Sequence, residues 1–279
     1  MEVKREKILI CSELYSTNYG DGVIAACLNH ACQLVNHNYV VDNIDWSLRS
    51  GFEKKIEHYS PGQHGINVSN HFTTIKRLFG WLLIRRKIAS KKWLAQFKRS
   101  DLLILGGGQL FMDYRLNFPV KIFNFYYVAK QANCNVCCVA CGVSSKWSAM
   151  GKHLFKRMLT YSGVKSISVR DGNSKINIMS HIPRLTPKVG IISDPAIFVD
   201  EVYKVKRKQK TRILGINIMH PETLKKVVPE CQNFIIGKME KLWKELIELL
   251  YQNGYKVELF TNGDPEDSKF MREIAQIVN

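Results

Sequence analysis

Short apolar runs alternate along most of the chain with segments whose apolar positions recur at helical spacing. The alternation of strands with helices is typical of a parallel sheet covered by helices, so we expect an α/β fold. The apolar runs predict strands at residues 7–12, 39–44, 101–105, 135–141, 166–169 and 190–193.

A second α/β pattern follows a polar run at residues 202–212. It reads as strand RILGINIM, amphipathic helix GKMEKLWKELIELLYQN, strand YKVELFTNG and a last helix that begins with Asp and Pro. The polar run is typical of a connection between domains, which predicts domains at residues 1–201 and 202–279. Two strands make a thin second domain, since small domains bury proportionally little surface.

Length and composition limit the class of protein. A chain of 279 residues with 46% hydrophobic composition can bury a substantial core. We find no apolar run of about 18 residues and no charged-then-apolar leader, so we expect neither a transmembrane helix nor a signal peptide. The expected location is the cytoplasm. Residues 50–71, rich in Gly, His, Ser and Asn, read as a long binding loop or lid, and their histidines lack metal-ligand spacing.

The eight cysteines fit that compartment, because most of them sit in apolar segments. The segment CNVCCVAC, residues 134–141, holds two interleaved C-x-x-C pairs, a pattern that also occurs in zinc and iron–sulfur sites. Zinc sites usually separate their pairs by a dozen or more residues, and an extended chain points neighbouring side chains to opposite faces. We therefore predict a buried strand and no metal site.

The net charge of +17 attracts anions whatever the fold. A nucleic acid, an anionic membrane surface and an acidic substrate are the three partners that fit. Residues 73–100 form the densest basic region and resemble a basic amphipathic helical segment that can lie on a membrane. A packed helix with a solvated basic face is the alternative. We find no signature of a nucleic-acid-binding module, so nucleic acid is the weakest of the three.

The candidate site residues follow the predicted strands, because ligands of doubly wound sheets bind outside the carboxyl ends of the strands. After the first strand, Asn18, Gly20 and Asp21 form a turn at a predicted helix start. Free N–H groups at such a start favour an anion. Neither a G-x-G-x-x-G nor a P-loop sequence is present, so the turn by itself favours an ordinary capped turn.

Three later strand ends carry further candidates. DLLILGGG ends in Gly106, Gly107 and Gly108, which let backbone amides approach a ligand, and Gln109 and Asp113 follow with hydrogen-bonding groups. Arg170 suits a phosphate or carboxylate, unless it pairs internally with Asp171. Asp194, held by the following proline, is either a site residue or a helix cap.

Taken together, four segments resemble one family. NYGD before a helix, LLILGGGQLFMD, SVRDGNS and SDPAI, in this order and spacing, resemble the polysaccharide pyruvyl transferase family over about residues 7–275. The resemblance implies two Rossmann-like domains similar to the GT-B glycosyltransferases, the second of them shortened here. It also implies that the opening turn belongs to a site.

The family is understood to transfer pyruvyl from phosphoenolpyruvate to sugar hydroxyls, so the resemblance implies a transferase of exopolysaccharide biosynthesis. Its partners would be phosphoenolpyruvate and a sugar or lipid-linked glycan, with peripheral contact at the inner membrane face. Such a donor needs cations or N–H groups for its carboxylate and phosphate, and the reaction needs an acid and a base. Arg170 would clamp the anion, Gly106–Gly108 would cradle the ligand, and Asp21 or Asp113 would contact or deprotonate the sugar hydroxyl.

The chain also departs from the family. Members continue well beyond this length with an Arg-x-His element near the donor, and no R-x-H sequence occurs here. His220, after the strand GINIM, is a candidate cleft residue or an ordinary loop histidine. A shortened, inactive member, a chain completed by another polypeptide, and a different activity are the alternatives. A non-catalytic glycan-binding homologue and a GT-B-like glycosyltransferase therefore stay open. We expect no cofactor.

Overall fold

The computed structural model describes residues 5–52, 86–113, 116–204, 211–227 and 235–278. Two compact units divide the chain, one of residues 1–15 and 21–204, the other of residues 16–20 and 205–279. The loop predicted at 50–71 and residues 73–85 of the predicted basic segment lie almost wholly outside the described residues. Whether residues 1–201 and 202–279 fold as separate domains stays a prediction.

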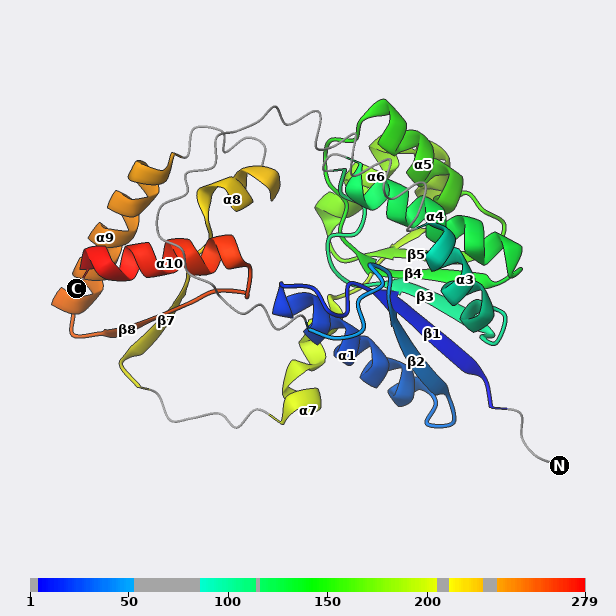
Figure 1. Ribbon diagram of the computed structural model, residues 1–279, viewed down its shortest axis with the longest axis horizontal. Helices are drawn as coiled ribbons and strands as arrows, with labels where there is room; N and C mark the ends of the chain where they lie inside the picture. Colours follow the sequence, from blue (N-terminus) through cyan, green and yellow to red (C-terminus); the bar gives the residue numbers. More distant parts are fainter. Residues whose placement is uncertain (1–4, 53–85, 114–115, 205–210, 228–234, 279) are drawn as a thin grey trace. The chain divides into compact units, whose positions relative to one another are not determined.

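The first unit contains one six-stranded sheet in which every paired strand is parallel (Figure 1). Its order is β2-β1-β3-β4-β5-β6, so the order reverses between β1 and β3. The strands are β1 (Lys7–Ser12), β2 (Val40–Asp45), β3 (Leu102–Gly106), β4 (Asn135–Cys141), β5 (Val164–Val169) and β6 (Val189–Ile191). Each lies within a few residues of its predicted position, and the alternating pattern is confirmed.

Helices connect the strands and cover both faces of the sheet (Figure 1). On one face, α1 packs Leu28 against Ile8 and Ile10; on the other, aromatic residues of α3, α4 and α5 form the larger core. The elements are α1 (Tyr19–Val35), α3 (Arg86–Phe97), α4 (Asn117–Gln131), α5 (Ala149–Leu159), α6 (Gly172–His181) and α7 (Val199–Tyr203), with short 3-10 turns at Pro183–Lys188 and Pro195–Phe198.

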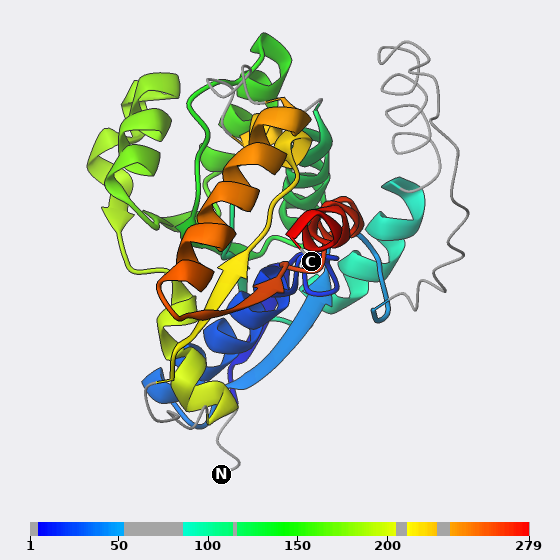
Figure 2. The same ribbon diagram turned by 90° about the vertical axis from the view of Figure 1, so that its left-hand side faces the viewer.

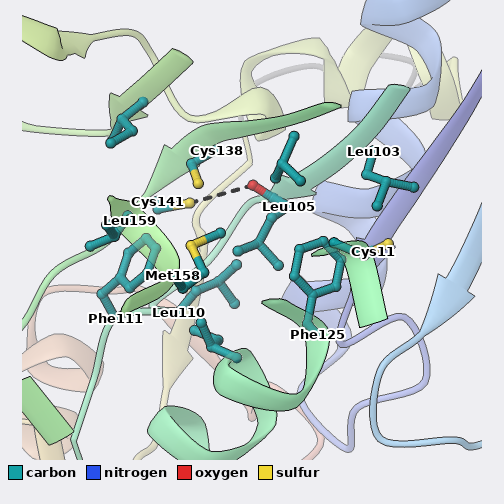
Figure 3. Packing of buried hydrophobic residues seen from close by; sticks show 14 of the residues in the cluster. Cys11, Leu103, Leu105, Leu110, Phe111, Phe125, Cys138, Cys141, Met158 and Leu159 are labelled. Atoms are coloured by element: carbon teal, nitrogen blue, oxygen red, sulfur yellow. Dashed lines mark hydrogen bonds between the residues drawn. The ribbon is translucent and has the colours of Figure 1, made fainter. Parts of the chain in front are cut away.

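Strand β4 shows why the cysteine-rich segment is buried. Cys138 and Cys141 are fully buried in the larger core, where the Cys141 thiol donates to the carbonyl of Leu105 at 3.6 Å (Figure 3). Burial raises the pKa of the Cys141 thiol to about 12. The prediction of a buried strand is confirmed, and the seven described cysteines are free thiols.

The second unit is a small α/β structure with two parallel strands side by side (Figure 2). Its core is built from Ile218, Met239, Ile247, Phe270 and Ile274. The predicted strands and helices are all present: β7 (Ile213–Asn217), α9 (Ile236–Gln252), β8 (Lys256–Phe260) and α10 (Pro265–Val278). The structure adds one helix that the sequence did not predict, α8 (Pro221–Val227).

Candidate functional site

The reversal of strand order places two predicted segments next to each other. The chain segments that follow β1 and β3 flank the point where the order changes, which is where ligands of doubly wound sheets bind. Asp21 lies in the first turn of α1 after β1, and Gly106–Gly108 end β3. A Cβ placed on Gly108 would lie 3.4 Å from Oδ1 of Asp21, so the two segments are in contact.

The three glycines have different physical reasons to be glycine. A Cβ on Gly106 would lie 2.9 Å from Leu28 of α1, and one on Gly107 would overlap the Ile24 side chain. Gly107 and Gly108 also have φ values of +75° and +76°, which other residues rarely adopt. Two glycines therefore let α1 pack against the strand end, and the third keeps the space beside Asp21 open.

The predicted amide cradle is only partly available. The Gly107 N–H donates to the carbonyl of Val139 at 3.0 Å, and this bond continues the sheet. The Gly108 carbonyl accepts hydrogen bonds from Gly142 at 2.8 Å and Leu110 at 3.0 Å, which fixes the loop. The cradle stays a prediction, and its candidate donor is the Gly108 amide.

Arg170 lies at the end of β5 in a group of polar side chains, which we call the Arg170 cluster: Arg170, Gln109, Asp171 and Asp194. Arg170 donates from Nη2 to Oε1 of Gln109 at 2.6 Å. Its guanidinium also lies 3.4 Å from Asp171 and 3.9 Å from Asp194. The structure thus brings together residues from three strand ends, and it contains the internal Arg–Asp pair that was the alternative interpretation.

The two carboxylates of the Arg170 cluster also cap local turns. Asp171 accepts from the Ser174 N–H at 2.6 Å at the start of α6, and Asp194 accepts from Ala196 at 3.0 Å. Burial alone would raise the pKa of Asp171, but the Ser174 bonds and the charge of Arg170 lower it below its usual range. The Arg170 cluster therefore combines one cation with two carboxylates, and each carboxylate also accepts a hydrogen bond from a backbone N–H.

Asp113 is occupied by long-range hydrogen bonds. Its Oδ2 accepts from the backbone and the hydroxyl of Ser148 at 2.7 and 2.6 Å, and its Oδ1 accepts from Leu116 at 3.2 Å. Ser148 in turn caps α5 by accepting from Gly151. These bonds give Asp113 a structural role, and contact of Asp21 or Asp113 with a sugar hydroxyl stays a prediction.

Asn18, Gly20 and His220 belong to the second unit. The Asn18 side chain accepts from the Gly20 N–H at 3.0 Å, which closes the predicted turn. His220 accepts from Glu222 N–H at 3.1 Å and packs its ring on Phe270, with 5.3 Å between ring centroids. These contacts give Asn18 and His220 local structural roles. Contact of Asn18, Gly20 and His220 with a substrate stays a prediction.

The sequence interpretation missed a second polar group, the inner network of Glu13, Asp45, Arg49 and Lys121. Lys121 lies 2.8 Å from Glu13, and Arg49 lies 2.8 Å from Asp45 and also contacts Glu13. Burial would raise the pKa of Glu13, but Lys121, Arg49 and a bond from Ser47 lower it. Glu13 and Asp45 stand at strand ends, a signal that could have found them; Lys121 lies within a helix and gave none.

The described residues contain no group of three or more His, Cys, Asp or Glu side chains that could hold a metal ion. Within the same ranges, no helix is long and apolar enough to cross a membrane. Of the predicted basic segment, residues 86–97 form α3, which buries Trp93 and Phe97 in the core and leaves Lys91 and Lys92 exposed. This part is a packed helix with solvated lysines.

Fold and site together define a doubly wound α/β protein whose strand ends carry an arginine-centred polar cluster. A model of the polysaccharide pyruvyl transferase family matches residues 18–275, nearly the whole chain. The chain belongs to the polysaccharide pyruvyl transferase family, and the predicted resemblance is confirmed. No curated protein matches the chain in sequence.

Solved structures resemble this chain at low sequence identity. The S. aureus MnaA–UDP co-structure matches with a TM-score of 0.50 and 11% identity over 98% of this chain and 65% of that one. This chain therefore spans 65% of the length of that relative. UDP-GlcNAc 2-epimerase from Neisseria meningitidis, bound to UDP-GlcNAc, matches with a TM-score of 0.41 and 14% identity, covering 98% and 69%. The MnaA likeness shows the α/β fold of GT-B-like enzymes and confirms the predicted fold class.

Proposed function

We propose that the protein transfers pyruvyl from phosphoenolpyruvate to a sugar hydroxyl of a bacterial exopolysaccharide or of its lipid-linked precursor. Family membership supports a transferase. The observation that carries the donor assignment is Arg170, a cation held at a strand end by Gln109 and two carboxylates.

Arg170 suits the donor because it is held in place without being enclosed. Its side chain is 33% exposed, and its 3.9 Å separation from Asp194 is long for an ion pair. A planar guanidinium can bind both oxygens of a carboxylate or phosphate, so the donor's anion would replace the weaker contact with Asp194. The Gly108 amide and the start of α1 add positive potential beside Asp21.

The reaction requires a proton at the methylene carbon and loss of a proton from each of two sugar hydroxyls. Protonation gives the adjacent carbon oxocarbenium character, and a hydroxyl oxygen bonds to that carbon as Asp21 accepts its proton. A second hydroxyl then displaces phosphate and closes a cyclic ketal, and phosphate carries away the remaining proton. Arg170 stabilises the negative charge of the donor throughout.

The setting that fits this proposal is the cytoplasmic face of the inner membrane, where lipid-linked glycans are assembled. Asn18, Gly20, Gln109, Asp194 and His220 are the residues that we propose for substrate contacts. The net charge of +17 supports contact with anionic lipid headgroups.

Phosphate release from phosphoenolpyruvate in the presence of acceptor glycan tests the proposal. The wild type should release phosphate only with acceptor, and Asp21→Asn should bind phosphoenolpyruvate but lose turnover about 100-fold or more. Asp42→Asn, an exposed change on β2, is the matched control and should keep full activity.

Two outcomes would replace the proposal with another function. Thermal stabilisation by a UDP-sugar but not by phosphoenolpyruvate would indicate a GT-B-like glycosyltransferase. The S. aureus MnaA structure, which has a similar fold, holds UDP. Glycan binding with no turnover of either donor would indicate a non-catalytic glycan-binding homologue.

A further inference from the structure

One stretch of the first unit is almost free of carboxylates. Residues 114–193 contain a single acidic residue, Asp171. The same stretch contains twelve basic residues: Arg115, Lys121, Lys130, Lys146, Lys152, Lys156, Arg157, Lys165, Arg170, Lys175, Arg184 and Lys188. Lys121 belongs to the inner network and Arg170 to the Arg170 cluster, so both have partners. The other ten basic residues belong to neither of these two groups.

Six of these cations line three adjacent hollows, and we call this surface the basic track: Lys130, Lys156, Arg157, Lys165, Arg184 and Lys188. The hollows have volumes of about 490, 310 and 240 Å³. The first two share His153 and Arg157, and the last two share Thr160 and Arg184, so they form one continuous depression. No carboxylate is among the described residues that line it.

The six cations are exposed and make no ion pair with a described carboxylate. Placing like charges side by side costs free energy, and here no acidic neighbour offsets that cost. A bound polyanion would offset it by neutralising several charges at once, with an attraction that salt weakens.

Aromatic rings accompany the cations along the basic track. Phe123, Tyr126 and Tyr127 line the largest hollow, and Tyr161 lines the smallest. The rings of Tyr126 and Tyr161 pack edge to face with centroids 5.6 Å apart, and Phe123 packs on Tyr126 at 5.7 Å. Flat apolar rings beside charged groups fit a ligand that carries both ring faces and anions.

The basic track lies near the amino-terminal ends of the strands, whereas the proposed site lies at their carboxyl ends. It includes the last turn of α5, the end of α4 and Lys165 near the start of β5. Arg170 follows the other end of β5, and five residues of extended strand separate it from Lys165 by about 16 Å. Substitutions in the track can therefore be tested without touching the residues assigned to donor chemistry.

We propose that the basic track binds an acidic glycan, namely the pyruvylated part of the polymer that the enzyme modifies. The inference rests on the proposed function, because each pyruvyl ketal leaves one carboxylate on a sugar ring. A glycan chain presents both carboxylates and the faces of its sugar rings, which matches a depression lined by both cations and aromatic rings. Concave hollows suit such a chain better than they suit the flat surface of a bilayer.

Binding of one glycan in two forms tests this inference. The probes are fragments of a pyruvylated bacterial polysaccharide and the same fragments after mild acid has removed the ketals. Calorimetry with the full chain should show at least about tenfold tighter binding of the pyruvylated fragments, and salt should weaken that binding. Equal affinity for the two forms would overturn the proposal.

Charge-matched variants locate the binding. Lys156→Gln, Arg157→Gln and Arg184→Gln, combined in one protein, should weaken binding of the pyruvylated fragments at least about tenfold. The control Lys91→Gln, Lys92→Gln and Lys98→Gln removes the same charge from exposed positions in and just after α3 and should change affinity less than about twofold. Equal losses in the two variants would overturn the proposal.

The remaining outcomes separate other partners and separate this inference from the proposed function. Tighter binding of anionic phospholipid vesicles or single-stranded RNA, with no competition from pyruvylated fragments, would assign the track to a membrane or a nucleic acid and overturn the proposal. Phosphate release with a short acceptor should be equal in wild type and triple variant. Absence of that activity, with selective fragment binding intact, would reject the proposed donor chemistry and leave the track assigned.

Discussion

The inner network and the Arg170 cluster both lie at strand ends of one sheet, yet they differ in burial and pairing. Asp45 of the inner network has a fully buried side chain, and its contacts with Arg49 and those of Lys121 with Glu13 are as short as 2.8 Å. In the Arg170 cluster, Arg170 and Asp194 are 33% and 34% exposed and stand 3.9 Å apart.

This difference in pairing indicates which charged group can more easily bind a ligand. The inner network pairs two cations with two carboxylates, and Asp45 also accepts hydrogen bonds from the backbone of Tyr15 and Ser47. An entering anion would have to break several short contacts there. In the Arg170 cluster, an anion needs to displace only a long and partly solvated contact, so the proposed donor site is the cluster with the weaker internal pairing.

The largest expected effect is on stability, from the inner network. Asp45→Ala removes a buried carboxylate that pairs with Arg49 and accepts hydrogen bonds from backbone N–H groups, which should lower the free energy of unfolding by about 3–5 kcal/mol. Urea unfolding measures it. Asp42→Ala, on the exposed face of the same strand, should change stability by less than about 0.5 kcal/mol. Similar values for the two variants would show that the network does not stabilise the fold.

The next effect is on activity, from the Arg170 cluster. Arg170→Ala should lower kcat/KM for phosphoenolpyruvate about 100- to 1000-fold, as loss of a group that stabilises charge in the transition state does. Arg170→Lys keeps the charge without the planar fork and should recover only part of the rate. The exposed Arg99→Ala is the control, with unchanged kinetics. Wild-type kinetics in Arg170→Ala would remove the anion clamp.

A smaller stability effect should come from the glycine loop between the two clusters. Gly107→Ala places a methyl group against Ile24 at a positive φ, which should cost about 1–3 kcal/mol. Gly172, the first residue of α6, has open space around its Cβ position, so Gly172→Ala should be neutral or slightly stabilising. Thermal unfolding of the two variants provides the comparison.

The smallest effect concerns pH. The pKa of Glu13 is lowered in the folded state, so its stabilising contribution is complete above the unfolded pKa, about 4.3, and is lost as pH falls through the folded pKa. Glu13→Gln should therefore lower stability near neutral pH, and its difference from wild type should shrink below about pH 4. A difference that stays constant down to acid pH would contradict the ionised pairing of Glu13.

The pattern of apolar positions along the sequence predicted the elements of the fold. The strands are short apolar runs, and the segments between most of them have apolar residues at helical spacing. Sequence patterns also predicted which strand ends carry polar side chains, and Gln109, Arg170 and Asp194 do meet. The patterns did not predict that Asp113 is occupied by Ser148, because 35 residues separate them in the chain. Lys121 was missed for a related reason, because a lysine inside a helix is expected to lie in solvent. Its partners, the carboxylate of Glu13 and the hydroxyl of Ser47, follow strands that are distant in the sequence.

The free thiols in the sheet provide a built-in reporter of opening. Burial raises the pKa of Cys11 and Cys138, so both stay protonated and shielded from alkylating reagents while the strands are paired. A reagent that modifies Cys138 must wait for the buried core around β4 to open. The rate of labelling at Cys138, followed by mass spectrometry, therefore measures how often the centre of the sheet opens.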